Sequence, residues 1–356
     1  MPSLKEIKGR INSISSTLAI TSAMKMVAAA KLQKAQMAIQ NMLPYERRLH
    51  SMLIDLMGAM NMSAAASEDG SVRGSGSAER GFDQSGDRLS LSNRHDLAGM
   101  DGAYSLMAQR EVRKVAIVAF ASNSSLCGAF NSNVIREATA VINEYRASGL
   151  GDADITVYSV GRKMAEAMKK LGFPSPADFT KMSDSPSYDA ASALAQELFD
   201  GFVSGRFDKV ELVYNHYKST SSQPTTRQTY LPLSLADATA DIQVGKITDS
   251  VSEPYADKVA EPVVRQNSPT TETPDLIVEP SKEELIVTLL PKVVRLRVFT
   301  TLLDSTAAEQ AARTVAMQLA TDNGNDLLQE LTLEYNKGRQ QKITSEILDL
   351  VGGSMQ

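Results

Sequence analysis

The stretch RINSISSTLAITSAMKMVAAAKLQKAQ, residues 10–36, lies in a segment almost free of helix breakers. Between Ser3 and Leu43 there is no proline, and Gly9 is the only glycine. Seam positions follow one another at spacings of three and four, which is the pattern of a helix packed along a second helix. They are Leu4, Ile7, Ile11, Ile14, Leu18, Thr21, Lys25, Ala28, Leu32, Ala35, Ile39 and Met42. The pattern predicts a helix of roughly 60 Å.

This seam weakens within TSAMKMVAAAK, residues 21–31. Thr21 and Lys25 occupy positions where apolar side chains are expected, and the flanking residues are alanines and methionines. Alanine lets a neighbouring helix approach closely, and methionine adapts to changing neighbours because its side chain is flexible.

The other end of the chain repeats the pattern. After Pro291 there is no further proline, and Gly352-Gly353 marks a stop. The apolar positions there, broken by a polar gap at Gly338-Arg339, are Leu328, Leu331, Tyr335, Ile343, Ile347 and Leu350. Two long helices at opposite chain ends predict an antiparallel pair, with the N-terminal helix in 1–60 and the C-terminal helix in 285–356.

The middle of the chain reads as an α/β domain, assigned to 110–235. Its apolar, β-rich stretches are Val112–Phe120, Ile155–Val160 and Val210–Tyr217, and they alternate with helical stretches near 130–147, 161–171 and 188–203. Alternation of this kind predicts a largely parallel, Rossmann-like sheet. Residues 226–231 are expected to add a strand at an edge. The predicted fold class is therefore α/β, with a long antiparallel coiled coil formed by the terminal helices.

Two further segments look like insertions, 61–109 and 236–284. Residues 63–104 are rich in Ser, Gly and Asp. Residues 236–284 carry 11 acidic and 4 basic side chains together with five prolines. Compositions of this kind are typical of surface loops, and their roles are left open.

The sequence offers little support for catalysis. It contains one cysteine, Cys127, and three widely separated histidines, which form no metal-ligand pattern. The phosphate-binding pattern G-x-x-x-x-G-K-[ST] does not occur. The stretch SNSSLCGAFN, residues 122–131, is interpreted as a strand-to-helix turn in preference to an anion site. No cofactor is expected.

Other features bear on location. The net charge of −5 argues against a nucleic-acid binder. The N-terminus lacks the apolar segment of a signal peptide, and the sequence has no run of 18 apolar residues. A cytoplasmic protein is the expectation, with peripheral membrane association left open.

Charge is unevenly distributed along the chain. Residues 1–50 hold eight basic and two acidic residues, and NKGRQQKIT (336–344) places three further basic residues near the other end. These are either solvated helix faces or surfaces that meet acidic loops of a partner. The sequence leaves both interpretations open.

Residues 10–36 and LTLEYNKGRQQKITSEILDLVGG (331–353) resemble the terminal helices of the gamma subunit of F-type ATP synthases. SLCGAFN (125–131), LVYNHYKS (212–219) and AMQLATDN (316–323) are similar to internal motifs of that family. The resemblance covers about residues 1–60, 110–235 and 283–356. Gly338 departs from it, since the family usually has alanine there, and glycine is expected to weaken the helix by up to about 1 kcal/mol.

The resemblance implies a non-catalytic rotor subunit. Its terminal helices would form a shaft inside a ring of alpha and beta subunits, and its α/β domain would form a foot that binds epsilon and the membrane c-ring. Proton flow would turn this rotor and drive the beta sites through their different affinities. The implied location is peripheral, on the cytoplasmic face of the bacterial inner membrane.

The resemblance also assigns contact residues in three groups. Those implied to contact beta are Met24, Lys25, Met26, Arg339, Gln340 and Thr344. Those implied to lie in an apolar sleeve at the top of the ring are Leu348, Leu350 and Val351. Those implied at the foot, facing the c-ring and epsilon, are Lys31, Lys34, Tyr214, Asn215 and Lys218. The alternatives are an α/β enzyme or small-molecule-binding domain with helical arms, and a coiled-coil adaptor.

Overall fold

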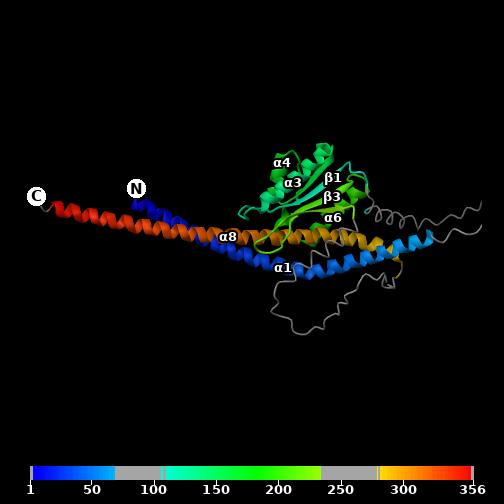
Figure 1. Cartoon of the computed structure of the whole chain (residues 1–356), viewed down its shortest axis with the longest axis horizontal. Helices are drawn as coiled ribbons and strands as arrows, with labels where there is room; N and C mark the ends of the chain where they lie inside the picture. Colours follow the sequence, from blue (N-terminus) through cyan, green and yellow to red (C-terminus); the bar gives the residue numbers. More distant parts are fainter. Residues whose placement is uncertain (1–2, 69–105, 107–109, 234–278, 280, 354–356) are drawn as a thin grey trace, which may run out of the picture.

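Two long helices and a smaller α/β domain make up this computed structural model, which describes residues 3–68, 106, 110–233, 279 and 281–353. Helix α1 spans Leu4–Glu68 and helix α8 spans Lys282–Gly353. Figure 1 shows the pair crossing at a shallow angle, with both chain ends at the same extremity and the domain on one side. The predicted combination of a helix pair with an α/β domain is confirmed.

The pairing is antiparallel and follows the predicted seam. Thr321 Oγ1 donates a hydrogen bond of 3.1 Å to Thr21 Oγ1, and farther along Leu32 and Ala35 pack with Ala307 and Ala311. Every seam position predicted for residues 4–42 is buried or half-buried. The three-four spacing therefore identified the face of α1 that meets α8.

Both helices continue through a proline, and they span 4–68 and 282–353 where the sequence predicted 1–60 and 285–356. Pro44 lies inside α1 and Pro291 inside α8. Proline removes one backbone donor and crowds the preceding turn, but apolar packing on either side holds these helices together. Leu290 and Val293 are buried beside Pro291, and Leu49 is buried one turn beyond Pro44.

The sheet of the α/β domain has four strands in the order β2-β1-β3-β4. They are β1 Val115–Phe120, β2 Ile155–Val160, β3 Lys209–Asn215 and β4 Thr225–Leu231. Strands β1, β2 and β3 are parallel, and β4 is antiparallel at the edge, with a register shift at Val210/Glu211. The predicted parallel sheet and its edge strand are confirmed.

Helices cover both faces of the sheet. They are α3 Phe130–Ala147, α4 Arg162–Lys170, α5 Thr180–Asp184, α6 Tyr188–Val203 and a 3-10 turn, η1, at Asp152–Asp154. Because side chains alternate along a strand, β1 packs Ile117 against α3 and α4, and Val118 and Phe120 toward α6 and the long helices. One continuous core therefore joins the domain to α8 and α1. Most of both predicted insertions lies outside the described residues.

Candidate functional site

The surface of the helix pair carries exposed apolar side chains along its length. Many large apolar residues there are exposed although neighbouring positions on the same helices are buried, and seven of them lie in the middle stretches of the two helices. They are Ile20, Met26, Val27, Met37, Leu319, Leu327 and Leu333. Apolar side chains gathered on an exposed element indicate a surface that meets a partner.

The end of α8 extends past the start of α1. Leu4, at the beginning of α1, lies against Gly338, and α8 continues from there to Gly353 (Figure 1). The seam predicted to continue through Ile343, Ile347 and Leu350 is wrong as a contact with α1, since all three side chains are exposed. The described part of α1 begins too late to cover them.

The residues implied to contact beta fall on two parts of the helix pair. Met24 and Lys25 are half-buried at the seam, whereas Met26 is 66% exposed. On the projecting part of α8 the implied residues Arg339, Gln340 and Thr344 are all exposed. Gln340 and Thr344 line one side of a shallow hollow together with Lys337 and Leu348.

The implied sleeve residues are exposed apolar side chains at this tip. Leu348 is 65%, Leu350 74% and Val351 50% exposed. Each would remove half or more of its side-chain surface from water inside a narrow apolar collar, which favours such an environment by roughly 1–2 kcal/mol per side chain. The structure thus makes these residues available for that role.

The implied foot residues divide by burial. Lys31, Lys34 and Lys218 are exposed, whereas Tyr214 and Asn215 are 9% and 1% exposed. Asn215 Nδ2 donates to the Phe130 carbonyl at 3.1 Å, and Asn215 Oδ1 accepts from Thr225 Oγ1 at 2.7 Å. The prediction of a partner contact therefore rests on the three lysines, while the two buried residues hold the end of β3 in place.

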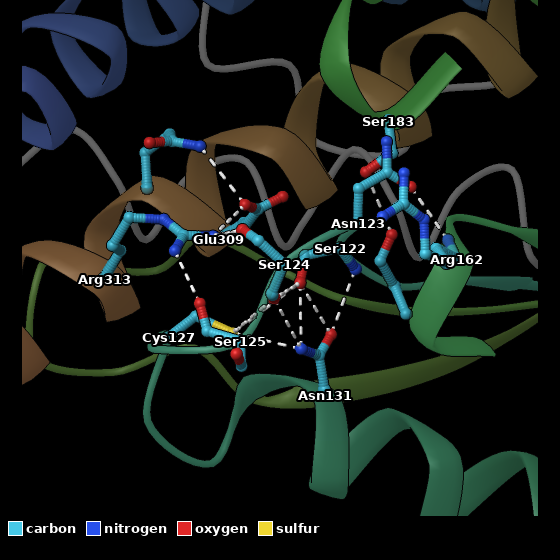
Figure 2. A network of polar contacts seen from close by, with 12 residues as sticks. Ser122, Asn123, Ser124, Ser125, Cys127, Asn131, Arg162, Ser183, Glu309 and Arg313 are labelled. Carbon is cyan, nitrogen blue, oxygen red and sulfur yellow. Dashed lines mark hydrogen bonds and ion pairs between the residues drawn. The ribbon is translucent and has the colours of Figure 1, made fainter. Parts of the chain in front are cut away.

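The turn between β1 and α3 is closed by a compact set of hydrogen bonds (Figure 2). Asn131 Oδ1 accepts from the Ser122 amide at 3.0 Å, and Asn131 Nδ2 donates to the Ser124 carbonyl at 3.2 Å and to Cys127 Sγ at 3.2 Å. Leu126, with φ of 69°, and Gly128, with φ of 58°, turn the backbone back toward α3. The predicted strand-to-helix turn is confirmed, and Cys127 is buried in it.

Arg313 of α8 fixes this turn to the shaft (Figure 2). Its guanidinium donates to the Ser125 carbonyl at 2.8 Å, to Ser124 Oγ at 2.9 Å and to Glu309 Oε1 at 2.5 Å. Arg313 is 8% and Glu309 7% exposed. Burial raises the pKa of Glu309 above its usual value, although the contact with Arg313 acts in the opposite direction. Arg313, which is held in a buried ion pair within α8, thus joins the domain to the helix that the resemblance places in the shaft.

Two glycines of α8 accommodate leucines of α1. A Cβ atom at Gly338 would lie 3.1 Å from Leu4 Cδ2, and one at Gly324 would lie 2.6 Å from Leu18 Cδ2. Distances this short require the leucines to move. Gly338 was expected only to weaken the helix, and the structure adds a packing reason for its presence.

The ionic cluster around Glu211 stabilises the fold of the α/β domain. Glu211 is buried and contacts Arg227, Lys209 and Tyr145, with Tyr145 Oη donating to Glu211 Oε1 at 2.5 Å. Burial would raise the pKa of Glu211, but the hydrogen bonds from these partners hold it below its usual value. The cluster ties α3 to β3 and β4, and a carboxylate occupied in this way is a poor general base.

Neither a metal site nor a membrane span emerges from the described part of the chain. Its His, Cys, Asp and Glu side chains form no group of three that would hold a metal ion. Its helices contain no stretch apolar and long enough to cross a bilayer.

Sequence reasoning missed Arg313, Glu309, His216 and Asp304 as functional candidates. Arg313 contacts a turn 188 residues earlier in the sequence, and a single sequence does not reveal such distant pairs. The i, i+4 spacing of Glu309 and Arg313 indicates an ion pair on a helix. Exposed helical pairs have the same spacing, so it does not show that this pair is buried.

Comparisons with known proteins agree with the resemblance. Residues 3–355 match the family described as ATP synthase. The chain is 47% identical to the ATP synthase gamma chain of Phocaeicola vulgatus over 355 residues and 44% identical to that of Bacteroides thetaiotaomicron over 356, covering 100% of all three. Both predicted insertions therefore lie within full-length matches to these relatives. A chain of the Euglena gracilis mitochondrial ATP synthase (OSCP/F1/c-ring) has a similar fold, with a TM-score of 0.54, 17% identity, and coverage of 99% of this chain and 93% of that one.

Proposed function

This chain belongs to the family of ATP synthase gamma chains, and from that premise we propose how its surfaces carry out the work of a central-stalk rotor. It is the non-catalytic stalk subunit of the complex, and its partners are the alpha and beta subunits, epsilon and the c-ring. The observation that carries the proposal is the helix pair, which exposes apolar side chains along its length and continues into a projecting tip.

The shaft would enter the ring of alpha and beta subunits with the α8 tip foremost. Leu348, Leu350 and Val351 would be enclosed by an apolar collar, which supports rotation because apolar contacts have no directional preference. Lower on the shaft, the proposed contacts with beta are Met24, Lys25 and Met26 on α1, and Arg339, Gln340 and Thr344 on α8.

The α/β domain would carry torque between the c-ring and the shaft. Its core is continuous with α1 and α8, and the hydrogen bonds of Arg313 to Ser124 and Ser125 fix its first turn to α8. Lys31, Lys34 and Lys218 are the proposed foot contacts with epsilon and the c-ring. Through them the chain would lie at the cytoplasmic face of the inner membrane without entering it.

A photo-cross-linking experiment tests the proposed contacts. A benzophenone label on Gln340→Cys, in a complex reconstituted with the cognate alpha and beta subunits, is expected to cross-link to beta. Cys127 is buried and should stay unlabelled. Because a covalent bond stops rotation, the cross-linked fraction should lose steady-state ATP hydrolysis.

The matched control is the same label on Lys170→Cys, an exposed position at the far end of α4. It should leave hydrolysis unchanged after illumination. Failure of position 340 to reach beta would contradict the proposed placement of the tip, and cross-linking to beta without any loss of hydrolysis would contradict the proposed rotation.

A further inference from the structure

Three consecutive residues at the end of β3 connect the α/β domain to both shaft helices. Asn215 binds within the domain, through Phe130 and Thr225. The next residue, His216, places Nδ1 2.6 Å from Asp304 Oδ2 of α8. The amide of Tyr217 then donates to the other oxygen of Asp304 at 2.9 Å. The carboxylate of Asp304 is therefore held by two successive residues of the foot.

Tyr217 extends this connection to α1. Gln36 Nε2 donates to the Tyr217 hydroxyl at 2.7 Å. The ring of Tyr217 also packs against two clusters of buried side chains, one containing Leu32 and Ala35 and the other Cys127 and Phe130. We call Asn215, His216, Tyr217, Gln36 and Asp304 the β3 joint. It is a place where α1, α8 and the domain meet within one short peptide.

His216 is the member of the β3 joint whose charge changes near neutral pH. The hydrogen bond with Asp304 raises its pKa above the usual value, while burial and Lys218 oppose that increase. Asp304 on α8 and Lys218 in the same loop are the charges that act on it. The α1 side presents the neutral Gln36, and the β1–α3 turn and the joint itself add the titratable groups Cys127 and Tyr217.

We propose that His216 is a pH-sensitive positioning residue of the β3 joint, whose protonated form ties the foot to the shaft more firmly than its neutral form. The idea rests on the rotor function, because a joint between foot and shaft matters only where torque passes between them. A neutral imidazole still donates one hydrogen bond to Asp304, so alkaline conditions loosen the joint without breaking it.

The direction of the pH effect on the joint follows from the linkage between proton binding and folding. Since the folded chain binds the His216 proton more tightly than the unfolded chain, the added stability is fully present below the pKa of the unfolded histidine, near 6.5. It is lost as pH rises through the higher pKa of the folded state. Each pKa unit between the two states changes the opening equilibrium of the joint about tenfold.

Hydrogen exchange of the peptide 212–219 in the reconstituted complex tests this. After correction for the intrinsic rate, protection in the wild type should fall several-fold between pH 6 and pH 9. His216→Lys, which stays charged over this range, should show a flat profile, and His216→Gln should show a flat profile at lower protection. The same fall in all three proteins would overturn the proposal.

A second measurement separates this inference from the rotor function. The NMR titration of the His216 ring in the full chain, assigned by its absence from His216→Gln, should give a pKa above 6.5 that falls in Asp304→Asn. A pKa at or below 6.5, unmoved by Asp304→Asn, would refute the switch. Rotation by the His216→Gln complex would leave the rotor assignment intact in either case, whereas loss of rotation by the wild type would count against the rotor assignment.

Discussion

Arg313→Met is expected to lower the free energy of unfolding of the full chain by about 3–5 kcal/mol, as measured by urea denaturation. The substitution keeps the length of the side chain but removes the donors to Ser124, Ser125 and Glu309. The carboxylate of Glu309, which is largely buried, then has no cation beside it on α8. Removing one partner of a buried pair costs more than removing both, because the remaining charge stays out of water.

The stability that Arg313→Met loses relative to the wild type should increase with pH. Burial already raises the pKa of Glu309, and Arg313 opposes that increase, so the variant carries a still higher pKa in the folded state. The unfolded carboxyl ionises near its ordinary value, about 4.3. Stability of the variant should therefore fall as pH rises from that value, and the loss should be larger at pH 8 than at pH 5.

The double variant Glu309→Leu/Arg313→Met is the control. It removes the buried charge together with its partner, so it should be more stable at pH 8 than Arg313→Met alone. The free energy of unfolding lost by the double variant can be compared with the losses of Glu309→Leu and Arg313→Met measured separately. If it equals their sum, the pair does not act as a unit.

Met24→Lys is expected to impair coupling far more than assembly. Met24 is half-buried at the seam, and a second ammonium beside Lys25 would strengthen attraction to an acidic loop of beta in some rotor positions. About 1.4 kcal/mol of extra stabilisation of one position slows the step that leaves it about tenfold. ATP turnover at beta that does not advance a rotor held in this way would uncouple the two processes. Protons pumped per ATP hydrolysed, measured in reconstituted vesicles, should then decrease while the complex purifies in normal yield.

Two further variants separate charge from packing. Met24→Leu keeps an apolar side chain of similar volume and should couple normally. Met24→Lys/Lys25→Met keeps the net charge and should recover part of the coupling. A Met24→Lys complex that assembles poorly but couples normally would instead assign Met24 to packing between the two helices.

The sequence predicted the parts of the structure that depend on local periodicity. The seam from Leu4 to Met42 follows from spacing alone, because each position lies one helical turn from the next. The strands and helices of the α/β domain were found for the same reason, although β1 begins at Val115 and β3 ends at Asn215. The end of β3 frees His216 and Tyr217 to reach the shaft.

Features that depend on the relative placement of distant segments could not be predicted in this way. The apolar spacing of Ile343, Ile347 and Leu350 resembles a continued seam, but α1 begins beside Gly338 and cannot cover them. Arg313 and Asp304 look like ordinary helical charges until the fold brings the turn at 122–131 and the end of β3 against α8. Resemblance to a family identified the partners, and the structure shows which of the implied residues have exposed side chains.

Single-molecule rotation tests the central claim most directly. The cognate alpha and beta subunits would be immobilised as a ring around this chain. The probe would be attached to this chain at Lys218→Cys, an exposed position of the foot. With ATP present, the account predicts stepwise rotation of the probe in one direction, which stops when ATP is removed. ATP turnover by such complexes with a stationary or randomly moving probe would contradict it.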